Sequence, residues 1–350
     1  MVGKMGRTAD PGEEVRHPAE ELEKLAVTVL TGAGAPDDVA TRVARSLVEA
    51  NLLGYDSHGV RRLEPYVEFV RTGQVVAGAR AEVAWTRGAT ALVDGHRGFG
   101  QPAAHLAVDT AAGLAADYGT ATVVVTACNH VGRLGEYVGR LADSGLIGLA
   151  FCNADPTVAP YGGRSRVLGT NPLAWAAPAG PEAPALVMDY ATSASAEGKL
   201  AVARDRGEQA PPGAVIDAEG RPSRDPADFY SGGALLPFGG HKGYGLGLMI
   251  DVVGGLLSGA GAASLPGYDF TNGTVLVTID VARFRPLAEF REQVEQVRTV
   301  LHDVPPAAGS AGVRLPGEPE EDVRRDRTER GIPIPARTWD TLTALAAGRP

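Results

Sequence analysis

The sequence predicts an α/β protein in which helices and strands follow one another in mixed order. Apolar runs of strand length, such as residues 121–126 and 274–281, are separated by helical patterns such as residues 101–118. Helical periodicity also occupies both ends of the chain. No G-x-G-x-x-G lies between a strand and a helix with an acidic residue about 20 positions later, so the usual Rossmann fingerprint is absent.

The length and composition of the chain predict an ordinary soluble globular protein. A chain of 350 residues can bury a large core and fold as two or three lobes. A net charge of -9 argues against a nucleic-acid partner. No apolar run approaches the roughly 18 residues that span a bilayer, and the N-terminus is polar, so we expect no membrane association and a cytoplasmic location. Two cysteines, Cys128 and Cys152, suffice for neither a disulfide framework nor a zinc cluster, and we expect no metal site.

The N-terminal third reads as a disordered lead-in followed by helices. Residues 1–17 are polar and form the lead-in. Three helices are expected, the second after a Pro-Asp-Asp start signal, at residues 18–30, 37–53 and 59–71. A strand at 89–94 then precedes a helix at 101–118, which Gly119 closes.

The rest of the chain alternates between strands and helices. Strands are expected at residues 121–126, 146–151, 185–190 and 274–281. Helices are expected at residues 134–143, 195–204, 242–257, 286–301 and 337–347. A Gly/Pro/Asn-rich loop reaches to Pro172, and residues 209–226 form a Pro-rich linker.

The segment Asp56–Arg62 carries the clearest chemical signal. His58 and Arg62 stand four residues apart, so one helix face would present both side chains together. An imidazole can carry a proton near neutral pH, and a guanidinium can bind a carboxylate through two parallel hydrogen bonds. The pair suits a small 2-oxo or 2-hydroxy acid. For the heptapeptide alone, an N-capping Asp56 followed by a solvated basic face is the simpler interpretation.

Four further segments are richer in glycine and polar residues than plain connections require. Residues 129–135 follow a strand and open a helix, where backbone N–H groups bind anions, or they form an Asn/His-capped turn. Residues 169–172 place a hydroxyl and an amide beside a glycine and a proline, which suits a polar substrate, or they form a plain turn. Residues 189–193 end a strand with an acid and two hydroxyls, where ligand sites of α/β proteins tend to lie. Residues 237–245 combine glycines with Lys242 at a helix start, which suits a phosphate; a Gly-rich helix contact is the alternative. Lysine is rare here, which makes Lys199 and Lys242 candidates for specific roles.

Taken together, these segments resemble the malate/L-lactate dehydrogenase family, which is distinct from the Rossmann-type lactate and malate dehydrogenases. The resemblance spans residues 19–345. It rests on Asp-Ser-His-Gly with Arg62, Asn129-His130 with Gly132, Gly-Thr-Asn-Pro at 169–172, Asp189-x-Ala-Thr-Ser, Gly-Gly-His-Lys-Gly-Tyr-Gly at 239–245 and Arg-x-Pro-Gly-Glu at 314–318. The family acts on small 2-oxo and 2-hydroxy acids and on a cyclic imine acid.

The resemblance implies a role for each matching residue. His58 matches the proton donor, Ser57 its associated residue and Arg62 the clamp on the substrate carboxylate. The other substrate-binding positions implied are Thr170, Asn171 and Lys199. Contacts to NAD or NADP are implied for His130, Val131, Gly132, Arg133, Leu134, Asp189, Tyr190, Ala191, His241, Lys242, Arg314, Pro316, Gly317 and Glu318.

The resemblance also implies architecture and activity. It implies a non-Rossmann, L-sulfolactate dehydrogenase-like fold, with a helical substrate lobe at residues 18–118 and 282–350 and a mixed-sheet nicotinamide-binding lobe at residues 119–281. It implies a homodimer that transfers a hydride between NAD(P)H and the C2 carbonyl of a 2-oxo acid. Alternatives are a cyclic imine acid reductase, which Lys199 disfavours because that branch carries an acidic residue there, and a catalytically silent nicotinamide-binding homologue. A Ser57–His58 hydrolase is disfavoured because no G-x-S-x-G elbow exists.

Overall fold

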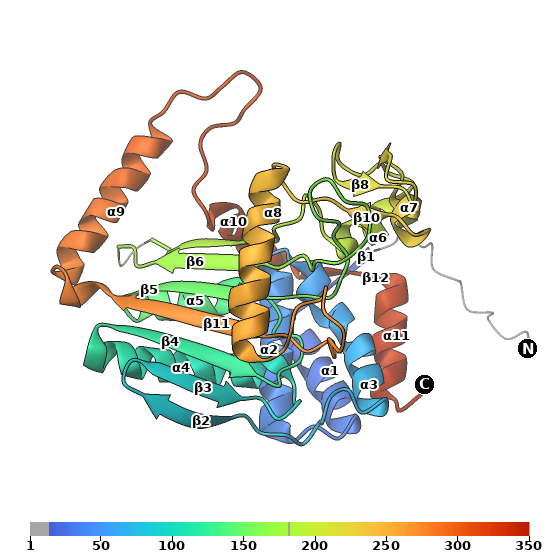
Figure 1. The fold of residues 1–350 in the computed structure, drawn as a ribbon, viewed down its shortest axis with the longest axis horizontal. Helices are drawn as coiled ribbons and strands as arrows, with labels where there is room; N and C mark the ends of the chain where they lie inside the picture. The colour runs from blue at the N-terminus through green and yellow to red at the C-terminus, as the bar shows by residue number, and fades with distance from the viewer. Residues whose placement is uncertain (1–13, 181–182, 350) are drawn as a thin grey trace, which may run out of the picture. The chain divides into compact units, whose positions relative to one another are not determined.

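The computed structural model describes residues 14–180 and 183–349. The chain divides into two compact units. The helical unit is Met1–Gly78 with Glu320–Pro350, and the sheet unit is Ala79–Pro319 (Figure 1). Each unit is described separately below.

The helical unit is built around two amphipathic helices, α1 (Ala19–Gly32) and α2 (Asp37–Leu52). Helices α1 and α2 each begin directly after a proline and carry acidic residues in the first turn, which favours helix formation at that end. Their fully buried side chains include Leu22 and Leu30 from α1 and Leu47 from α2. The unit comprises β1 (Glu14–His17), α1 (Ala19–Gly32), α2 (Asp37–Leu52), η1 (Asp56–His58), η2 (Val60–Arg62), α3 (Leu63–Arg71), most of α10 (Glu318–Arg330), β12 (Ile332–Pro335) and α11 (Ala336–Ala346).

The sheet unit contains a seven-stranded sheet in the order β2-β3-β4-β11-β5-β6-β7. Of its six pairings only β3–β4 is parallel. Such a sheet differs from the parallel doubly wound sheet of Rossmann proteins, as the missing glycine fingerprint predicts. The strands are β2 (Glu82–Arg87), β3 (Thr90–Asp94), β4 (Thr120–Thr126), β5 (Leu146–Cys152), β6 (Leu173–Ala177), β7 (Leu186–Tyr190) and β11 (Thr274–Asp280).

Helices α4 (Gly100–Tyr118) and α5 (Leu134–Asp143) cover one face of this sheet, and α8 (His241–Ile250) lies in front of the other face in Figure 1. The α4 contact surface consists mostly of alanines, which allow close approach to the sheet; Ala103, Ala107 and Ala111 are fully buried. In β4, buried and less buried residues alternate, as a strand with one covered face requires. Gly119 closes α4 with φ of 80°, as predicted.

The remaining part of the sheet unit follows β7 and precedes β11. It contains a small three-stranded sheet, α8 and the π-helical turn η3 (Asp251–Leu256) that continues α8. The smaller elements are α6 (Glu197–Arg206), β8 (Val215–Ile216), β9 (Pro222–Ser223), α7 (Pro226–Tyr230) and β10 (Ala234–Leu235). The 3-10 turn η4 (Val281–Arg283) follows β11.

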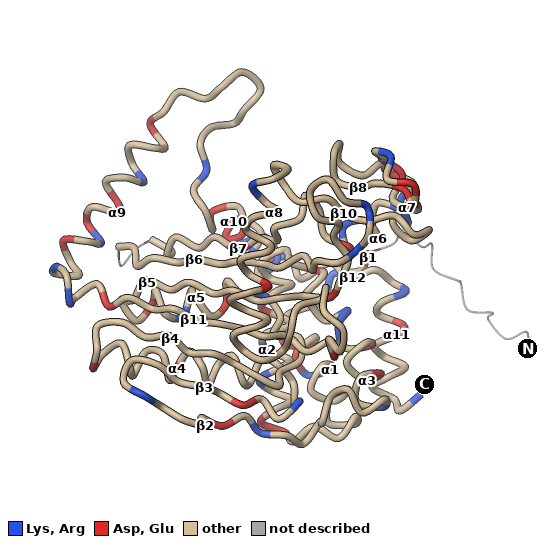
Figure 2. Tube along the Cα trace, in the orientation of Figure 1, with Lys and Arg blue, Asp and Glu red and all other residues tan. Residues whose placement is uncertain are grey.

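Helix α9 (Leu287–His302) has no buried residue. Acidic and basic side chains are interleaved along it (Figure 2). Val297 and Val300 are more than half exposed. Its packing therefore depends on polar contacts at its C-terminal end.

Several elements differ from the sequence predictions. Glu14–His17 form a strand paired with β12 rather than part of a disordered lead-in, because His17 is buried and β12 supplies backbone partners. The rest of that lead-in, residues 1–13, lies outside the described residues. The helix expected at 59–71 starts as one 3-10 turn, η2, before α3, and the expected linker at 209–226 contains β8 and β9.

Strand β2, helix α10 and strand β6 are among the elements that were not predicted. Every residue of the edge strand β2 is exposed, and the strand contributes no buried apolar face. Helix α10 is almost entirely charged and shows no helical apolar period; pairs such as Arg324–Glu321 accompany it instead. Strand β6 follows Asn171-Pro172, which the sequence pattern indicates as the end of a loop.

The unit boundaries also differ from the expected lobes. Strand β3 pairs with β4 and α4 packs on the sheet, so residues 79–118 belong to the sheet unit. Residues 282–319 belong there too. Which lobe binds a nucleotide stays a prediction.

In the described part of the chain, no helix is both long and apolar enough to cross a bilayer. Within the same residues, no group of three or more His, Cys, Asp or Glu side chains could hold a metal ion.

Candidate functional site

Ser57, His58 and Arg62 form a short hydrogen-bonded chain in the helical unit. The Ser57 hydroxyl lies 2.9 Å from His58 Nδ1, and Arg62 Nε donates to the Ser57 carbonyl at 2.7 Å. All three side chains are half-buried. The serine thus orients the imidazole ring, and its backbone anchors the guanidinium.

The reason these residues lie together differs from the predicted helix face. His58 ends one 3-10 turn and Arg62 ends the next, with Gly59 in extended backbone between them. A Cβ on Gly59 would lie 2.2 Å from the Asn51 side chain, so only glycine fits this break. The i,i+4 argument is therefore wrong, because no continuous helix joins His58 to Arg62; hydrogen bonds through Ser57 join them instead.

Asn51, Asp56 and Arg327 support this turn. Asn51, which is 2% exposed, donates to Asp56 at 2.7 Å and accepts the Val60 amide at 2.8 Å. Both terminal nitrogens of Arg327 donate to the Asp56 carboxylate. Asp56 is thus an ion-pair partner, not the helix cap of the simpler interpretation. Sequence analysis missed Asn51 and Arg327; Arg327 is 271 positions away in a chain rich in arginine.

In the sheet unit, the loop after β4 leads into α5 and meets the end of β7. Val131 is buried and accepts a hydrogen bond from the Tyr137 hydroxyl, while Gly132 has φ of 80°. The Gly135 amide in the first turn of α5 donates to the Asp189 carboxylate at 2.7 Å. The helix start that the sequence suggests as an anion site therefore binds a carboxylate of the chain itself.

Buried polar contacts join the 169–172 turn, the 189–193 segment and α8. Asn171 is fully buried at φ of 35°, and its amide oxygen accepts the Ala154 N–H. Its amide nitrogen donates to the Gly247 carbonyl and to Asp251, both at 2.9 Å. The Thr192 hydroxyl donates to the carbonyls of Thr170 and Asn171. We call Asn171, Thr192 and Asp251 the buried clamp. Asn171 therefore acts inside the protein, whereas Thr170 of the same turn is half-buried.

The start of α8 combines exposed cations with an unusual backbone. Gly239 and Gly240 have φ of 56° and 63°, which favours glycine at both positions. His241 and Lys242 follow and are exposed, with the His241 ring 6.1 Å from the Tyr161 ring. A Cβ on Gly243 would lie 2.2 Å from the Phe238 carbonyl oxygen, so the turn packs tightly on its own backbone. Lys242 is thus presented from a rigid glycine turn.

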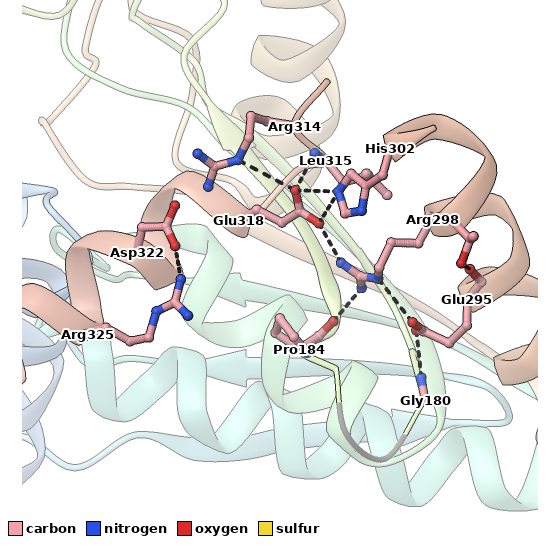
Figure 3. Close-up of polar contacts among 11 residues, drawn as sticks. Gly180, Pro184, Glu295, Arg298, His302, Arg314, Leu315, Glu318, Asp322 and Arg325 are labelled. Carbon is pink, nitrogen blue, oxygen red and sulfur yellow. Dashed lines mark hydrogen bonds and ion pairs between the residues drawn. The ribbon is translucent and has the colours of Figure 1, made fainter. Parts of the chain in front are cut away.

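Glu318 holds the 314–318 loop against its neighbours (Figure 3). Arg298 and His302 of α9 bond its carboxylate at 2.9 and 3.0 Å, and the Leu315 amide donates to it at 2.9 Å. Burial opposes ionisation, yet these hydrogen bonds lower the pKa of Glu318. Arg314 Nε lies 3.7 Å from the same carboxylate.

The 314–318 loop also contacts the β7 edge, because the Pro316 carbonyl accepts the Val187 amide at 3.3 Å. The segments 130–135, 187–193 and 314–318 thus meet along β7, and α8 joins them through Thr192. Of the segments that carry the predicted cofactor positions, the start of α5 and the 314–318 loop thus both contact β7. Lys199, in contrast, is exposed on α6.

Comparison with known proteins identifies the family. The sequence model of malate/L-lactate dehydrogenase matches residues 17–343. The chain belongs to the malate/L-lactate dehydrogenase family. A malate dehydrogenase from Pyrococcus abyssi is 36% identical over 343 residues, covering 95% of this chain and 94% of the relative. An L-lactate dehydrogenase from Cupriavidus necator is 37% identical over 331 residues, covering 92% and 95%.

Solved structures of the malate/L-lactate dehydrogenase family share the fold. The structure of malate dehydrogenase from Pyrococcus horikoshii superposes with a TM-score of 0.87 at 33% identity, over 98% of each chain. The predicted resemblance and fold are thereby confirmed. Family membership supports a 2-hydroxy acid dehydrogenase of the malate, lactate or sulfolactate type.

Proposed function

We propose that this protein is an NAD(P)-dependent dehydrogenase that interconverts a small 2-oxo acid and its 2-hydroxy acid. The observation that carries the proposal is the hydrogen-bonded chain His58–Ser57–Arg62 in a member of a hydroxy acid dehydrogenase family. Reduction of a 2-oxo acid adds a hydride to C2 and a proton to the C2 oxygen. The chain must therefore orient the acid and supply one proton.

His58 is the proposed proton donor to the C2 oxygen. Its Nδ1 is engaged by the Ser57 hydroxyl, which fixes the ring, so Nε2 is the nitrogen that would transfer the proton. In the oxidative direction the same nitrogen accepts the hydroxyl proton. Histidine suits both directions because its charge changes near neutral pH.

Arg62 is the proposed clamp on the substrate carboxylate. Because its Nε is bound to the Ser57 carbonyl, its terminal amino groups are the donors that would grip the carboxylate. The proton donor and the clamp then share one anchor, Ser57. Thr170 and Lys199 are proposed to position other oxygens of the acid, and Asn171 contributes by fixing Thr170.

The sheet unit is proposed to hold the nicotinamide nucleotide. The residues present fit such a group: exposed Lys242 beside left-handed Gly239 and Gly240 offers a countercharge and close backbone approach for phosphates. The half-buried Asp189 and the 314–317 loop along β7 would line the rest. When bound, the reduced nucleotide supplies the hydride.

A homodimer is part of the proposal. Leu248, Val252 and Leu256 follow one another at intervals of four residues along α8 and η3, and each is between 45% and 49% exposed. A stripe of this kind favours burial against another surface. Size-exclusion chromatography with light scattering should give twice the chain mass of 36.2 kDa; the chain mass alone would contradict the dimer.

The direct test is oxidation of NADH and NADPH at 340 nm with a panel of 2-oxo acids. The panel includes matched ketones without a carboxylate and one cyclic imine acid. We expect turnover with at least one 2-oxo acid and none with the ketones, since Arg62 requires a carboxylate. Binding of a nucleotide without turnover of any acid would favour the silent homologue, and turnover of the imine alone would favour the reductase alternative.

A further inference from the structure

Asp251 is a buried carboxylate beside the 169–172 turn that the proposed mechanism does not use. It is the first residue of η3, and π-helical turns occur frequently at functional sites. Asp251 is 2% exposed. Its Oδ1 accepts the Asn171 amide, and its Oδ2 is buried without a hydrogen-bond partner among the described residues. Burying an ionised carboxylate with an unpaired oxygen costs free energy, which favours a functional reason for Asp251 at this position.

The contacts of Asp251 lead directly to the 169–172 turn. One N–H of Asn171 bonds Asp251 and the other bonds the Gly247 carbonyl, while its oxygen holds the Ala154 amide at 3.0 Å. This single side chain therefore links the turn to α8 and to the segment after β5. Asn171 adopts a left-handed backbone, so its side chain must be held to keep the turn in place.

We propose that Asp251 is a positioning residue which, as a carboxylate, holds the Asn171 amide and thereby fixes Thr170 and the first turns of α8 for substrate binding. The proposal rests on the proposed function. Asp251 itself touches neither acid nor nucleotide in this account. A carboxylate accepts a stronger hydrogen bond than a neutral acid does, so protonation of Asp251 weakens its hydrogen bond with the Asn171 amide.

The pKa of Asp251 places this change in an accessible range. Burial raises it to about 6, although the Asn171 hydrogen bond lowers it. Three titratable groups lie on the facing segments: Tyr268, Asp155 and Cys152 at the end of β5. The Tyr268 hydroxyl donates a hydrogen bond to Asp155 at 3.3 Å. Lys242, Tyr244 and His241 lie on its own helix.

Two of the facing groups, Tyr268 and Cys152, stay protonated and uncharged across the neutral range. Burial raises the pKa of Tyr268, and it raises that of Cys152 to about 12. Neither group changes charge between pH 5 and 8. If the change in KM near pH 6 disappears in an Asp251 variant, it is therefore assigned to Asp251 and not to Tyr268 or Cys152.

The test uses the full-length protein and the variant Asp251→Asn, with Asp143→Asn as the matched control on an exposed position. Two readouts are taken from pH 5 to 8. The first is kcat and KM for a 2-oxo acid that the wild type reduces. The second is hydrogen exchange of the Ala154 amide, corrected for intrinsic rates, because that amide bonds Asn171 directly.

We expect the wild-type KM for the acid to rise about fivefold below pH 6, with Ala154 exchange accelerating in parallel. Asp251→Asn should show the raised KM and the faster exchange at every pH, without the limb, and Asp143→Asn should behave like the wild type. A wild-type profile and unchanged Ala154 protection in Asp251→Asn would overturn the proposal. So would altered protection with an unchanged KM.

A second variant keeps the test decisive where Asp251→Asn fails to fold. Asn171→Gly accepts the left-handed backbone but removes the amide through which Asp251 acts, so KM should be raised and Ala154 exchange faster at every pH, without the limb near pH 6. A limb that stays at the wild-type pH would contradict the proposal. Where the wild type reduces no 2-oxo acid, the proposed function fails, and Ala154 exchange alone decides whether Asp251 holds Asn171.

Discussion

The two polar clusters of this protein are held in different ways. Ser57, His58 and Arg62 are half-buried and bond one another across at most five positions in sequence. The buried clamp lies in the interior and joins residues up to 80 positions apart. The first arrangement leaves side chains accessible to a ligand, and the second consumes them in fixing the backbone. We therefore expect substitutions in the first cluster to act mainly on turnover and substitutions in the second to act on stability, with a smaller effect on KM.

The largest expected effect is on turnover in the accessible cluster. His58→Ala should lower kcat by roughly two to four orders of magnitude, the usual effect of a lost general acid. Steady-state rates with saturating acid and nucleotide measure it. The control is His96→Asn, an exposed histidine on a turn with φ of 48° that asparagine tolerates. Equal rates for wild type and His58→Ala would remove His58 from the mechanism.

The next effect is a pH dependence of the free energy of unfolding that arises in the buried clamp. The pKa of Asp251 is raised to about 6 in the folded chain from a model value of 3.8. The folded state thus binds more protons than the unfolded state between these values, and the free energy of unfolding falls as pH rises through that window. The loss is about 3 kcal/mol for a shift of this size.

Asp251→Asn lacks this titration. Its free energy of unfolding relative to the wild type should therefore rise by that amount between pH 4 and 6.5, as measured in urea. Other carboxylates are common to both chains and cancel in the difference. A constant difference across the range would show that Asp251 has the same pKa folded and unfolded.

A smaller kinetic effect is expected for the clamp on the substrate carboxylate. Arg62→Lys removes the bidentate donor and the Nε anchor but keeps the charge, so KM for the acid should rise about tenfold or more. The KM for NAD(P)H should stay near the wild-type value. Arg61→Lys is the matched control, because Arg61 is exposed and adjacent. Unchanged KM in Arg62→Lys would place the carboxylate grip elsewhere.

The smallest effects compare two glycines of α8. A Cβ on Gly243 meets the Phe238 carbonyl at 2.2 Å and the Thr192 carbonyl at 2.9 Å, both backbone atoms. Gly243→Ala should lower the free energy of unfolding by about 1–3 kcal/mol. Gly245 has no atom within 4 Å of such a Cβ, so Gly245→Ala should raise it by up to about 1 kcal/mol. Equal stability of both variants in urea would contradict the tight packing of this turn.

The accessible cluster and most long elements could be predicted from sequence because their signals are local. His58, Ser57 and Arg62 lie within one short segment, and α4 and β4 show clear periods and a glycine stop. Even there the reason was wrong, since Gly59 breaks the helix against Asn51, and no local pattern reveals a contact of that kind. Their catalytic and binding roles stay predictions.

The buried clamp could not be predicted because its partners are distant and its residue types are ambiguous. Asn171 looked like a substrate ligand in sequence, and only tertiary contacts show its amide bonding Gly247 and Asp251. Asp251 sits in an apolar helical run with no motif around it. The charged helix α10 and exposed strand β2 were missed for the related reason that neither has an apolar face.

The most direct test of the account is a fluorescence titration of NADH and NADPH into the wild type, His58→Ala and Lys242→Ala. The account assigns nucleotide binding to the sheet unit and proton transfer to His58. His58→Ala should therefore bind the preferred nucleotide with the wild-type Kd, while Lys242→Ala binds it at least tenfold more weakly through loss of a charge-assisted contact. Weakened binding in His58→Ala together with wild-type binding in Lys242→Ala would contradict the account.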